Sequence, residues 1–91
     1  MEKKRMKTAE IFDIVTNIIV EKFNYVGRNE VELESDLTND LGLDSLDLAE
    51  FTMKVESDFN IDLDKANPNE LNNLRTVEDV VDLIYKMINQ K

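Results

Sequence analysis

The chain contains no cysteine and no histidine among its 91 residues. The absence of cysteine excludes a disulfide framework, a thiolate nucleophile and a cysteine-based metal site, and it suits a reducing cytosol. The absence of histidine removes the base that usually activates a serine nucleophile, and it also disfavours zinc. Two glycines and one proline offer little turn chemistry for a many-stranded β fold, so the sequence favours helices.

Long apolar runs are also lacking. No stretch approaches the roughly 18 residues of a membrane span, and the basic N-terminus is not followed by the apolar segment of a signal peptide. We therefore expect a cytoplasmic protein without stable membrane association. The length indicates one small domain, with residues 1–7 as a flexible basic tail and residues 8–91 as a single domain.

Negative charge is concentrated in one part of the chain. Residues 30–64 hold twelve acidic residues against one basic residue, Lys54, which is a net charge of −11, whereas the whole chain carries −9. Such a surface repels phosphates and disfavours nucleic-acid binding. It favours basic protein partners, although acidic residues that serve solubility alone are the simpler explanation.

Apolar residues recur at helical spacing in several segments. Thr8 is expected to cap the first helix and Thr76 the last. A short helix is expected shortly before the last one, with Asn67 as its cap and Pro68 at its first helical position. The prediction is an all-α four-helix bundle with a short third helix, and with helices at about residues 9–22, 45–59, 68–74 and from 77 onward.

The segment of residues 23–43 shows no helical period and is predicted to be a long loop between the first two helices. Loops of about this length are often packed by their own side chains. The expected anchors of this loop in the core are Tyr25, Val31, Leu33, Leu37 and Leu41.

The second helix has two apolar faces. One is an ordinary core stripe of Leu48, Phe51, Val55 and Phe59. The other is centred roughly 150° away around the helix axis. It either contacts the short third helix or forms an exposed strip, rimmed by carboxylates, on which partners dock. This second stripe consists of Leu46, Ala49 and Met53.

Ser45 lies at or next to the N-cap of the second helix, directly after Asp44. It cannot act as a catalytic nucleophile in the usual way, because the chain has no histidine and no Lys or Arg between Arg28 and Lys54. Two roles remain. Ser45 caps the helix, a contribution of about 1 kcal/mol, or it is a site of modification, where a phosphate ester would lie at a helix N-terminus.

Calcium binding is a competing explanation for the acidic loop, because Asp36, Asp40 and Asp44 recur every four residues. An EF-hand loop needs acidic residues at its first, third and fifth positions and glycine at the sixth. Counted from Asp36, the third position is Thr38 and the sixth is Leu41, so the pattern fails. Loose, non-catalytic binding of a divalent cation at these carboxylates stays open, and no dedicated metal site is predicted.

The segment Asp40-Leu41-Gly42-Leu43-Asp44-Ser45-Leu46-Asp47 resembles the signature of the acyl carrier protein family. The resemblance extends from about residue 8 to residue 88. It implies that Ser45, flanked by Asp44 and Leu46, carries 4′-phosphopantetheine through a phosphodiester, transferred from coenzyme A by a phosphopantetheinyl transferase. Acyl groups would then be held as thioesters on the thiol of that arm. The chain would be a carrier and a substrate of other enzymes, not an enzyme itself.

The resemblance also implies a surface for partner enzymes on the second helix. The partners would be the transferase and the acyl-transferring and chain-elongating enzymes, through basic docking patches, with the carrier as a monomer. The acyl chain, when shielded, would lie between core residues such as Phe51, Val55 and Ile84. The implied partner-binding residues are Asp44, Leu46, Asp47, Ala49, Glu50, Met53 and Glu56.

The expected function is therefore acyl carriage in fatty-acid biosynthesis. Three features depart from the housekeeping pattern: a longer stretch between Ile61 and Thr76, the small residues Ala49 and Thr52, and the basic tail. They leave open a dedicated carrier for a polyketide, peptide, lipid or cell-wall pathway. A different class also stays open, namely a cation-binding or structural helical adaptor in which Ser45 is unmodified.

Overall fold

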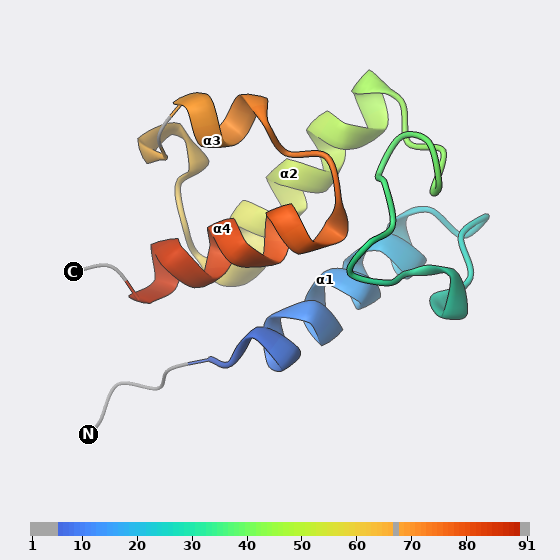
Figure 1. The fold of residues 1–91 in the computed structure, drawn as a ribbon, viewed down its shortest axis with the longest axis horizontal. Helices are drawn as coiled ribbons and strands as arrows, with labels where there is room; N and C mark the ends of the chain where they lie inside the picture. Colours follow the sequence, from blue (N-terminus) through green and yellow to red (C-terminus); the bar gives the residue numbers. More distant parts are fainter. Residues whose placement is uncertain (1–5, 67, 90–91) are drawn as a thin grey trace.

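The computed structural model describes residues 6–66 and 68–89, and Figure 1 shows that they form a helical bundle. Within this part of the chain no strand forms, apart from one isolated antiparallel bridge between Asp36 and Thr76. The predicted all-α bundle with a short third helix is confirmed. In chain order the elements are α1 (Thr8–Lys22), the 3₁₀ turn η1 (Arg28–Glu30), α2 (Ser45–Phe59), the 3₁₀ turn η2 (Leu63–Lys65), α3 (Pro68–Asn72) and α4 (Val77–Asn89).

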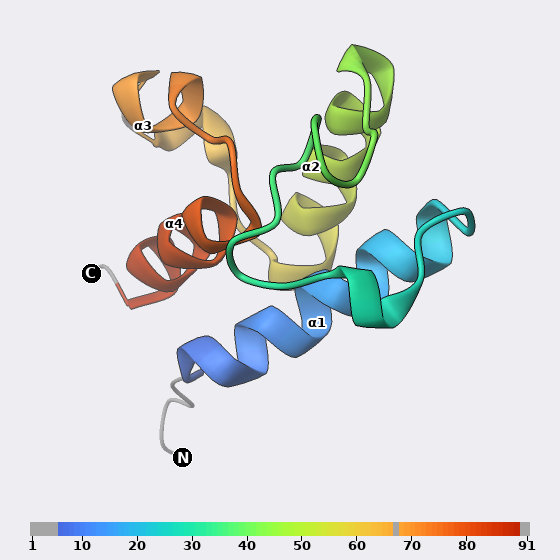
Figure 2. The ribbon, with the colours of Figure 1, turned by 45° about the vertical axis from the view of Figure 1, so that its right-hand side comes forward.

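The helices are arranged around α1, which packs against both α4 and α2. Figures 1 and 2 both place α4 between α1 and α3, so α3 lies on the outer side of the bundle. The long loop after α1 passes beside the first turn of α4 before it reaches α2. None of the helices in the described ranges combines the length and the apolar character that a membrane span needs.

The core is formed by one apolar face from each long helix. Apolar residues at helical spacing in α1, α2 and α4 supply these faces, and Leu48 and Phe59 of α2 and Ile88 of α4 are half-buried against the same core. Burial of these side chains is the main stabilising contribution, at about 1.5–3 kcal/mol for each fully buried aliphatic or aromatic residue. The buried residues of the three stripes are Ile11, Val15, Ile18, Ile19, Phe51, Val55, Val77, Val80, Val81 and Ile84.

Two of the expected helix ends differ in the structure. Thr8 is the first helical residue of α1 and not its cap, because the Ile11 N–H bonds to the Lys7 carbonyl oxygen at 3.0 Å and closes the first turn on residue 7. The Glu10 carboxylate then accepts the Lys7 backbone N–H at 2.9 Å. Helix α3 ends at Asn72, earlier than predicted, and its expected cap, Asn67, lies outside the described residues.

The predicted cap of α4 is confirmed. The Thr76 hydroxyl oxygen accepts the Asp79 N–H at 3.2 Å, and the Asp79 carboxylate accepts the backbone N–H groups of Thr76 and Arg75 at 3.1 and 2.9 Å. This reciprocal arrangement satisfies amide groups that have no partner within the helix.

The loop between α1 and α2 is anchored mainly as predicted. Val31, Leu37 and Leu41 are buried. Tyr25 and Leu33 are 60% and 43% exposed, so their assignment as anchors was wrong. Leu33 contacts the bundle through its backbone and not through its side chain, since its carbonyl oxygen accepts the Glu78 N–H of α4 at 2.9 Å.

Three further anchors in residues 23–43 were missed, namely Phe23, Val26 and Leu43, which are 4%, 3% and 0% exposed. Spacing did not identify them, because η1 and a series of turns replace the continuous extended backbone on which period-two patterns depend.

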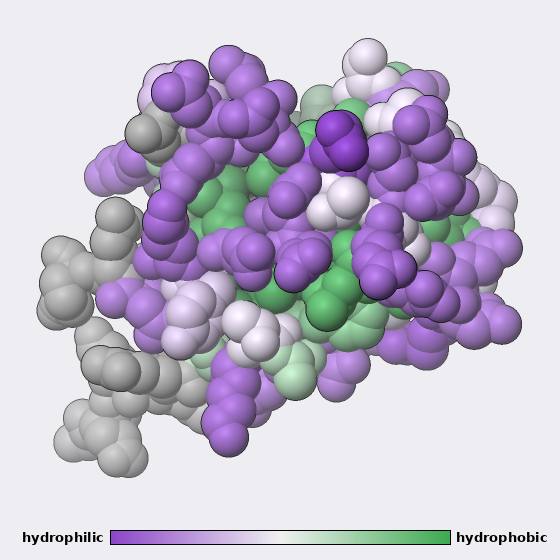
Figure 3. Space-filling view, in the orientation of Figure 1, coloured by the Kyte–Doolittle hydropathy of each residue, from purple (hydrophilic) through white to green (hydrophobic). Residues whose placement is uncertain are grey.

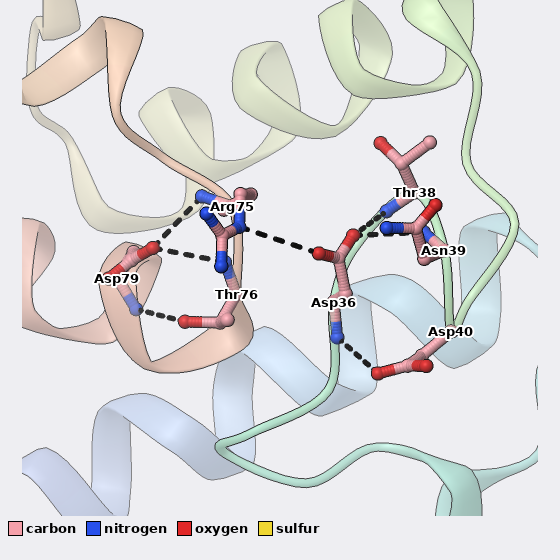
Figure 4. A network of polar contacts seen from close by, with 7 residues as sticks. All are labelled: Asp36, Thr38, Asn39, Asp40, Arg75, Thr76 and Asp79. Carbon is pink, nitrogen blue, oxygen red and sulfur yellow. Dashed lines mark hydrogen bonds and ion pairs between the residues drawn. The ribbon is translucent and has the colours of Figure 1, made fainter.

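Polar contacts join this loop to the start of α4, as Figure 4 shows. The Asp36 carboxylate accepts the backbone N–H groups of Thr38 and Asn39 at 3.0 and 2.9 Å and lies 3.6 Å from the Arg75 guanidinium. The Asp40 carboxylate accepts the Asp36 N–H at 2.7 Å. The N–H donors, followed by the nearby Arg75 charge, hold the pKa of Asp36 below its ordinary value of 3.8. Asp36 therefore stabilises the fold in its ionised form.

Leu43→Ala is predicted to destabilise the fold by about 2–5 kcal/mol, the range for removing a buried leucine side chain. The exposed Leu33→Ala is the matched control in the same loop and should stay within about 0.5 kcal/mol of the parent. Urea unfolding followed by circular dichroism measures both. Equal losses in the two variants would contradict the assignment of Leu43 as the anchor.

Asp36→Asn is predicted to change the pH dependence of stability. Because the folded-state pKa of Asp36 is lowered, its contribution is complete above pH 3.8 and is lost as the pH falls through the folded-state pKa. The asparagine can still accept the two N–H groups but carries no charge. The gap in urea midpoint between parent and variant should therefore narrow on acidification. Glu34→Gln controls for the loss of one negative charge, and a gap that is constant with pH would refute the prediction.

Candidate functional site

The start of α2 is capped by Asp44 and not by Ser45. The Asp44 carboxylate accepts the Asp47 N–H at 2.9 Å, and the Asp47 carboxylate accepts the Asp44 N–H at 3.2 Å. Ser45 is the first residue of the helix. The explanation of Ser45 as a simple helix cap is therefore wrong, since its neighbour and Asp47 already form the reciprocal cap.

Ser45 is exposed, and its hydroxyl makes no hydrogen bond to any residue in the part of the chain that the structure describes. Two residues earlier, Leu43 is fully buried, so the chain passes from the core to solvent within one turn of α2. Gly42 makes this passage possible with a φ of 78°, a left-handed conformation that glycine adopts without strain. The geometry leaves Ser45 accessible to a reagent or an enzyme.

Tyr25 contributes a contact at this site that the sequence did not reveal. Its hydroxyl donates to the Asp47 carboxylate at 3.1 Å and so ties the end of the α1 region to the first turn of α2. Desolvation, followed by the hydrogen bond to Asp47, raises the pKa of Tyr25 above its ordinary value of 10.0. The two residues are 22 positions apart, and neither helical nor strand periodicity links them.

The second apolar stripe of α2 faces solvent. Leu46 and Met53 are 67% and 65% exposed, and Ala49 between them is also exposed. The alternative in which this stripe packs against the third helix is therefore wrong. Exposed large apolar side chains at helical spacing, bordered by acids, have the character of a protein-binding surface.

The carboxylates beside this stripe have different surroundings. Glu50 is exposed and lies 3.9 Å from the Lys22 ammonium group. Glu56 is half-buried, and its carboxylate accepts the Leu63 N–H at 2.9 Å, which fixes η2 against α2. Glu50 is thus available to a partner, whereas Glu56 already has a structural contact.

A hydrophobic cavity of about 160 Å³ lies among α2, α3, α4 and the loop. It brings together the predicted Phe51, Val55 and Ile84. Figure 3 shows apolar surface at the bottom of a hollow bordered by hydrophilic side chains, over the space between α3 and α4. The residues from η2, α3 and the turn after it were not predicted, because their apolar positions are too few to show a period. The remaining lining residues are Leu37, Leu48, Thr52, Leu63, Leu71, Leu74, Val80 and Leu83.

The regular spacing of Asp36, Asp40 and Asp44 has a structural explanation. Asp36 and Asp40 accept backbone N–H groups inside the loop, and Asp44 caps α2. Within residues 6–66 and 68–89 no group of three or more Asp, Glu, His or Cys side chains could hold a metal ion.

An exposed serine at the start of an acidic helix and a hydrophobic cavity lined in part by the same helix are the features expected of a helical carrier domain. A family described as a phosphopantetheine attachment site matches residues 13–84. The acyl carrier protein of Coprothermobacter proteolyticus is 39% identical over 79 residues, which cover 87% of this chain and 92% of that protein. The acyl carrier protein of Thermotoga maritima is 42% identical over 79 residues, covering 87% and 93%. The chain belongs to the acyl carrier protein family.

This membership decides the class of activity. The chain is a carrier and not an enzyme, its cofactor is 4′-phosphopantetheine, and phosphopantetheinyl transferase and acyl-handling enzymes are its partners. The chain fits the cofactor, because Ser45 offers a free hydroxyl at a helix N-terminus, where the helix dipole favours a phosphodiester anion.

Proposed function

We propose that Ser45 carries the 4′-phosphopantetheine arm and that the chain holds acyl intermediates as thioesters in fatty-acid biosynthesis. The observation that supports this most directly is the exposed, unbonded hydroxyl of Ser45 within the segment of residues 40–47. When bound, the cofactor supplies the thiol that this cysteine-free chain lacks. Residues 8–91 would act as one monomeric carrier domain in the cytoplasm.

The chain's own residues hold the attachment point and shield the cargo. Asp44 and Asp47 fix the first turn of α2, so that Ser45 projects from a rigid helix end. The cavity removes part of the acyl chain from water at about 0.8 kcal/mol per buried methylene. A partner enzyme has to overcome this modest gain to reach the thioester, so the cargo is protected between enzymes and still released on contact.

The exposed stripe Leu46, Ala49 and Met53 is the proposed contact surface for partners, with Asp44, Asp47, Glu50 and Glu56 at its border. Basic patches on the transferase and on acyl-transferring enzymes would pair first with the exposed Glu50, and with Asp44, Asp47 and Glu56 through the lone pairs that their structural hydrogen bonds leave free. Exposed pairs contribute about 0.2–1 kcal/mol each and are weakened by salt. Short-lived contacts of this kind suit a carrier that meets several enzymes in turn.

A dedicated carrier for another pathway is the second candidate. Two of the features that depart from the housekeeping pattern contribute to the cavity that would receive the cargo. Thr52 lines it from α2, and the longer stretch between Ile61 and Thr76 supplies Leu63, Leu71 and Leu74. The acyl species found on protein purified from its own cell would decide between the two. Straight saturated chains of several lengths would support the fatty-acid role, and one unusual acyl group would support the dedicated carrier.

Ser45→Ala is predicted to abolish modification. After incubation with coenzyme A, magnesium and a broad-specificity phosphopantetheinyl transferase, the parent should gain the mass of one phosphopantetheine group in intact-protein mass spectrometry. Ser57→Ala changes an exposed serine on the same helix and should gain the same mass as the parent. A mass gain in Ser45→Ala would refute the attachment site, and no gain in the parent would contradict the carrier proposal and favour the unmodified adaptor.

Glu50→Lys is predicted to lower kcat/KM of the transferase roughly fivefold, since an exposed charge pair contributes up to about 1 kcal/mol. The effect should shrink as salt is added. Glu78→Lys makes the same charge change on an exposed residue of α4 and should have less effect. Circular dichroism should show unchanged helicity in both variants. Equal losses in the two would indicate a general charge effect and not a docking surface on α2.

A further inference from the structure

One side chain in the cavity differs in chemistry from all the others. Of the eleven residues that line it, ten have hydrocarbon side chains, and Thr52 of α2 carries a hydroxyl group. A carrier whose cargo is purely hydrocarbon gains nothing from this group, because covering a polar atom with an apolar chain costs free energy.

The Thr52 hydroxyl has its proton already in use. Its oxygen donates to the Ala49 carbonyl at 2.9 Å within α2. A hydroxyl has one proton but two lone pairs, so the oxygen can still accept a hydrogen bond. Thr52 therefore presents an acceptor, and the group that would satisfy it is a donor.

Thr52 lies at the rim of the cavity. It is half-buried, as are Leu48 beside it on α2 and Leu71 and Leu74 on the opposite side. The other seven lining residues are buried and form the floor. An acyl chain tethered through its thioester enters the cavity with its methyl end first. Its tail then lies on the floor and its first carbons lie at the rim, so Thr52 contacts the carbons nearest the thioester.

We propose that Thr52 is a specificity-determining residue that favours acyl chains with a hydroxyl group close to the thioester, such as 3-hydroxyacyl groups. This inference rests on the proposed function of Ser45. The hydroxyl of such a chain donates to Thr52 while the bond from Thr52 to Ala49 stays intact.

The two competing cargoes lack this interaction. An unsubstituted chain displaces water from the Thr52 oxygen without replacing its hydrogen bond. A 3-oxoacyl chain offers an acceptor alone, so Thr52 would have to give up its bond to Ala49 in order to donate to it. The carrier therefore distinguishes between stages of chain processing by one hydrogen bond.

The cavity also sets the length of the probe. Its volume of about 160 Å³ is close to that of an engineered apolar cavity of about 150 Å³ that holds benzene, so it accommodates about six carbons. Hexanoyl and 3-hydroxyhexanoyl groups are therefore the matched cargoes.

The test loads the parent and Thr52→Val from hexanoyl- and 3-hydroxyhexanoyl-coenzyme A with a broad-specificity transferase. Two properties are then measured, the melting temperature and the rate of thioester cleavage by added hydroxylamine. Each rate is divided by that of the same acyl group on free pantetheine, which removes intrinsic reactivity. In the parent the 3-hydroxyhexanoyl group should be protected about two- to tenfold more than hexanoyl, the range for one net hydrogen bond. In Thr52→Val this order should be lost or reversed.

Three further variants keep the result interpretable. Thr52→Ser retains the hydroxyl and should keep the order of the parent. Thr52→Ala removes the hydroxyl without adding bulk and should lose the parent's order in the same way as Thr52→Val. It serves as the test if the valine variant does not fold. Ser57→Ala removes a hydroxyl from α2 outside the cavity lining and should match the parent.

The outcomes separate this inference from the proposed function. If the parent takes up neither acyl group, the proposed role of Ser45 fails. If loading succeeds but the ratio of 3-hydroxyhexanoyl to hexanoyl protection is the same in the parent, Thr52→Val and Thr52→Ala, then Thr52 does not distinguish the two acyl groups. The inference is then overturned. A ratio that Thr52→Ser also loses would assign the effect to shape and not to the hydroxyl, with the same consequence.

Discussion

The accessible position of Ser45 depends on the burial of Leu43. This leucine is fully enclosed by the core and holds the end of a long loop against the bundle. Gly42 allows the chain to reach it, and the cap formed by Asp44 and Asp47 turns the chain at once into α2. A buried anchor two residues before the proposed attachment point would give the arm a rigid base, which a mobile loop could not provide.

The acidic residues of this chain serve two purposes. Several of them accept backbone N–H groups: Asp36 and Asp40 close the loop, Asp44 and Asp47 cap α2, and Glu56 holds η2. Such charge-assisted hydrogen bonds stabilise the fold even though the segment as a whole repels itself. Solubility alone therefore does not explain the charge. Glu50, which is exposed beside the apolar stripe, belongs to the proposed surface for basic partners, the second purpose.

The outer position of α3 explains how a small bundle can hold a cargo. Helices α1, α2 and α4 form the core, while η2, α3 and the following turn supply leucines on the far side of the cavity. The contact between Lys86 and Glu70 and the bond from Leu63 to Glu56 hold this segment in place. The cavity between this segment and the core would give an acyl chain room that a closely packed core does not offer.

Helical periodicity predicted α1, α2 and α4 and their buried stripes, and the residues around Ser45 indicated the family. These features are local, because spacing along one helix decides which face is apolar and a short motif contains its own cap. The exposure of Leu46 and Met53, by contrast, could not be separated from packing against α3, since both fit the same spacing. Segments without a period supply the contacts that the sequence did not reveal. These are the bond of Tyr25 to Asp47, the burial of Leu43 in the core, and the positions around the cavity of Leu63, Leu71 and Leu74. The sequence by itself determined the helices, the acidic surface and the serine. The tertiary structure alone decided which apolar face stays free, which acids are engaged and that Thr52 lies at the rim of the cavity, because these depend on contacts between residues far apart in the chain.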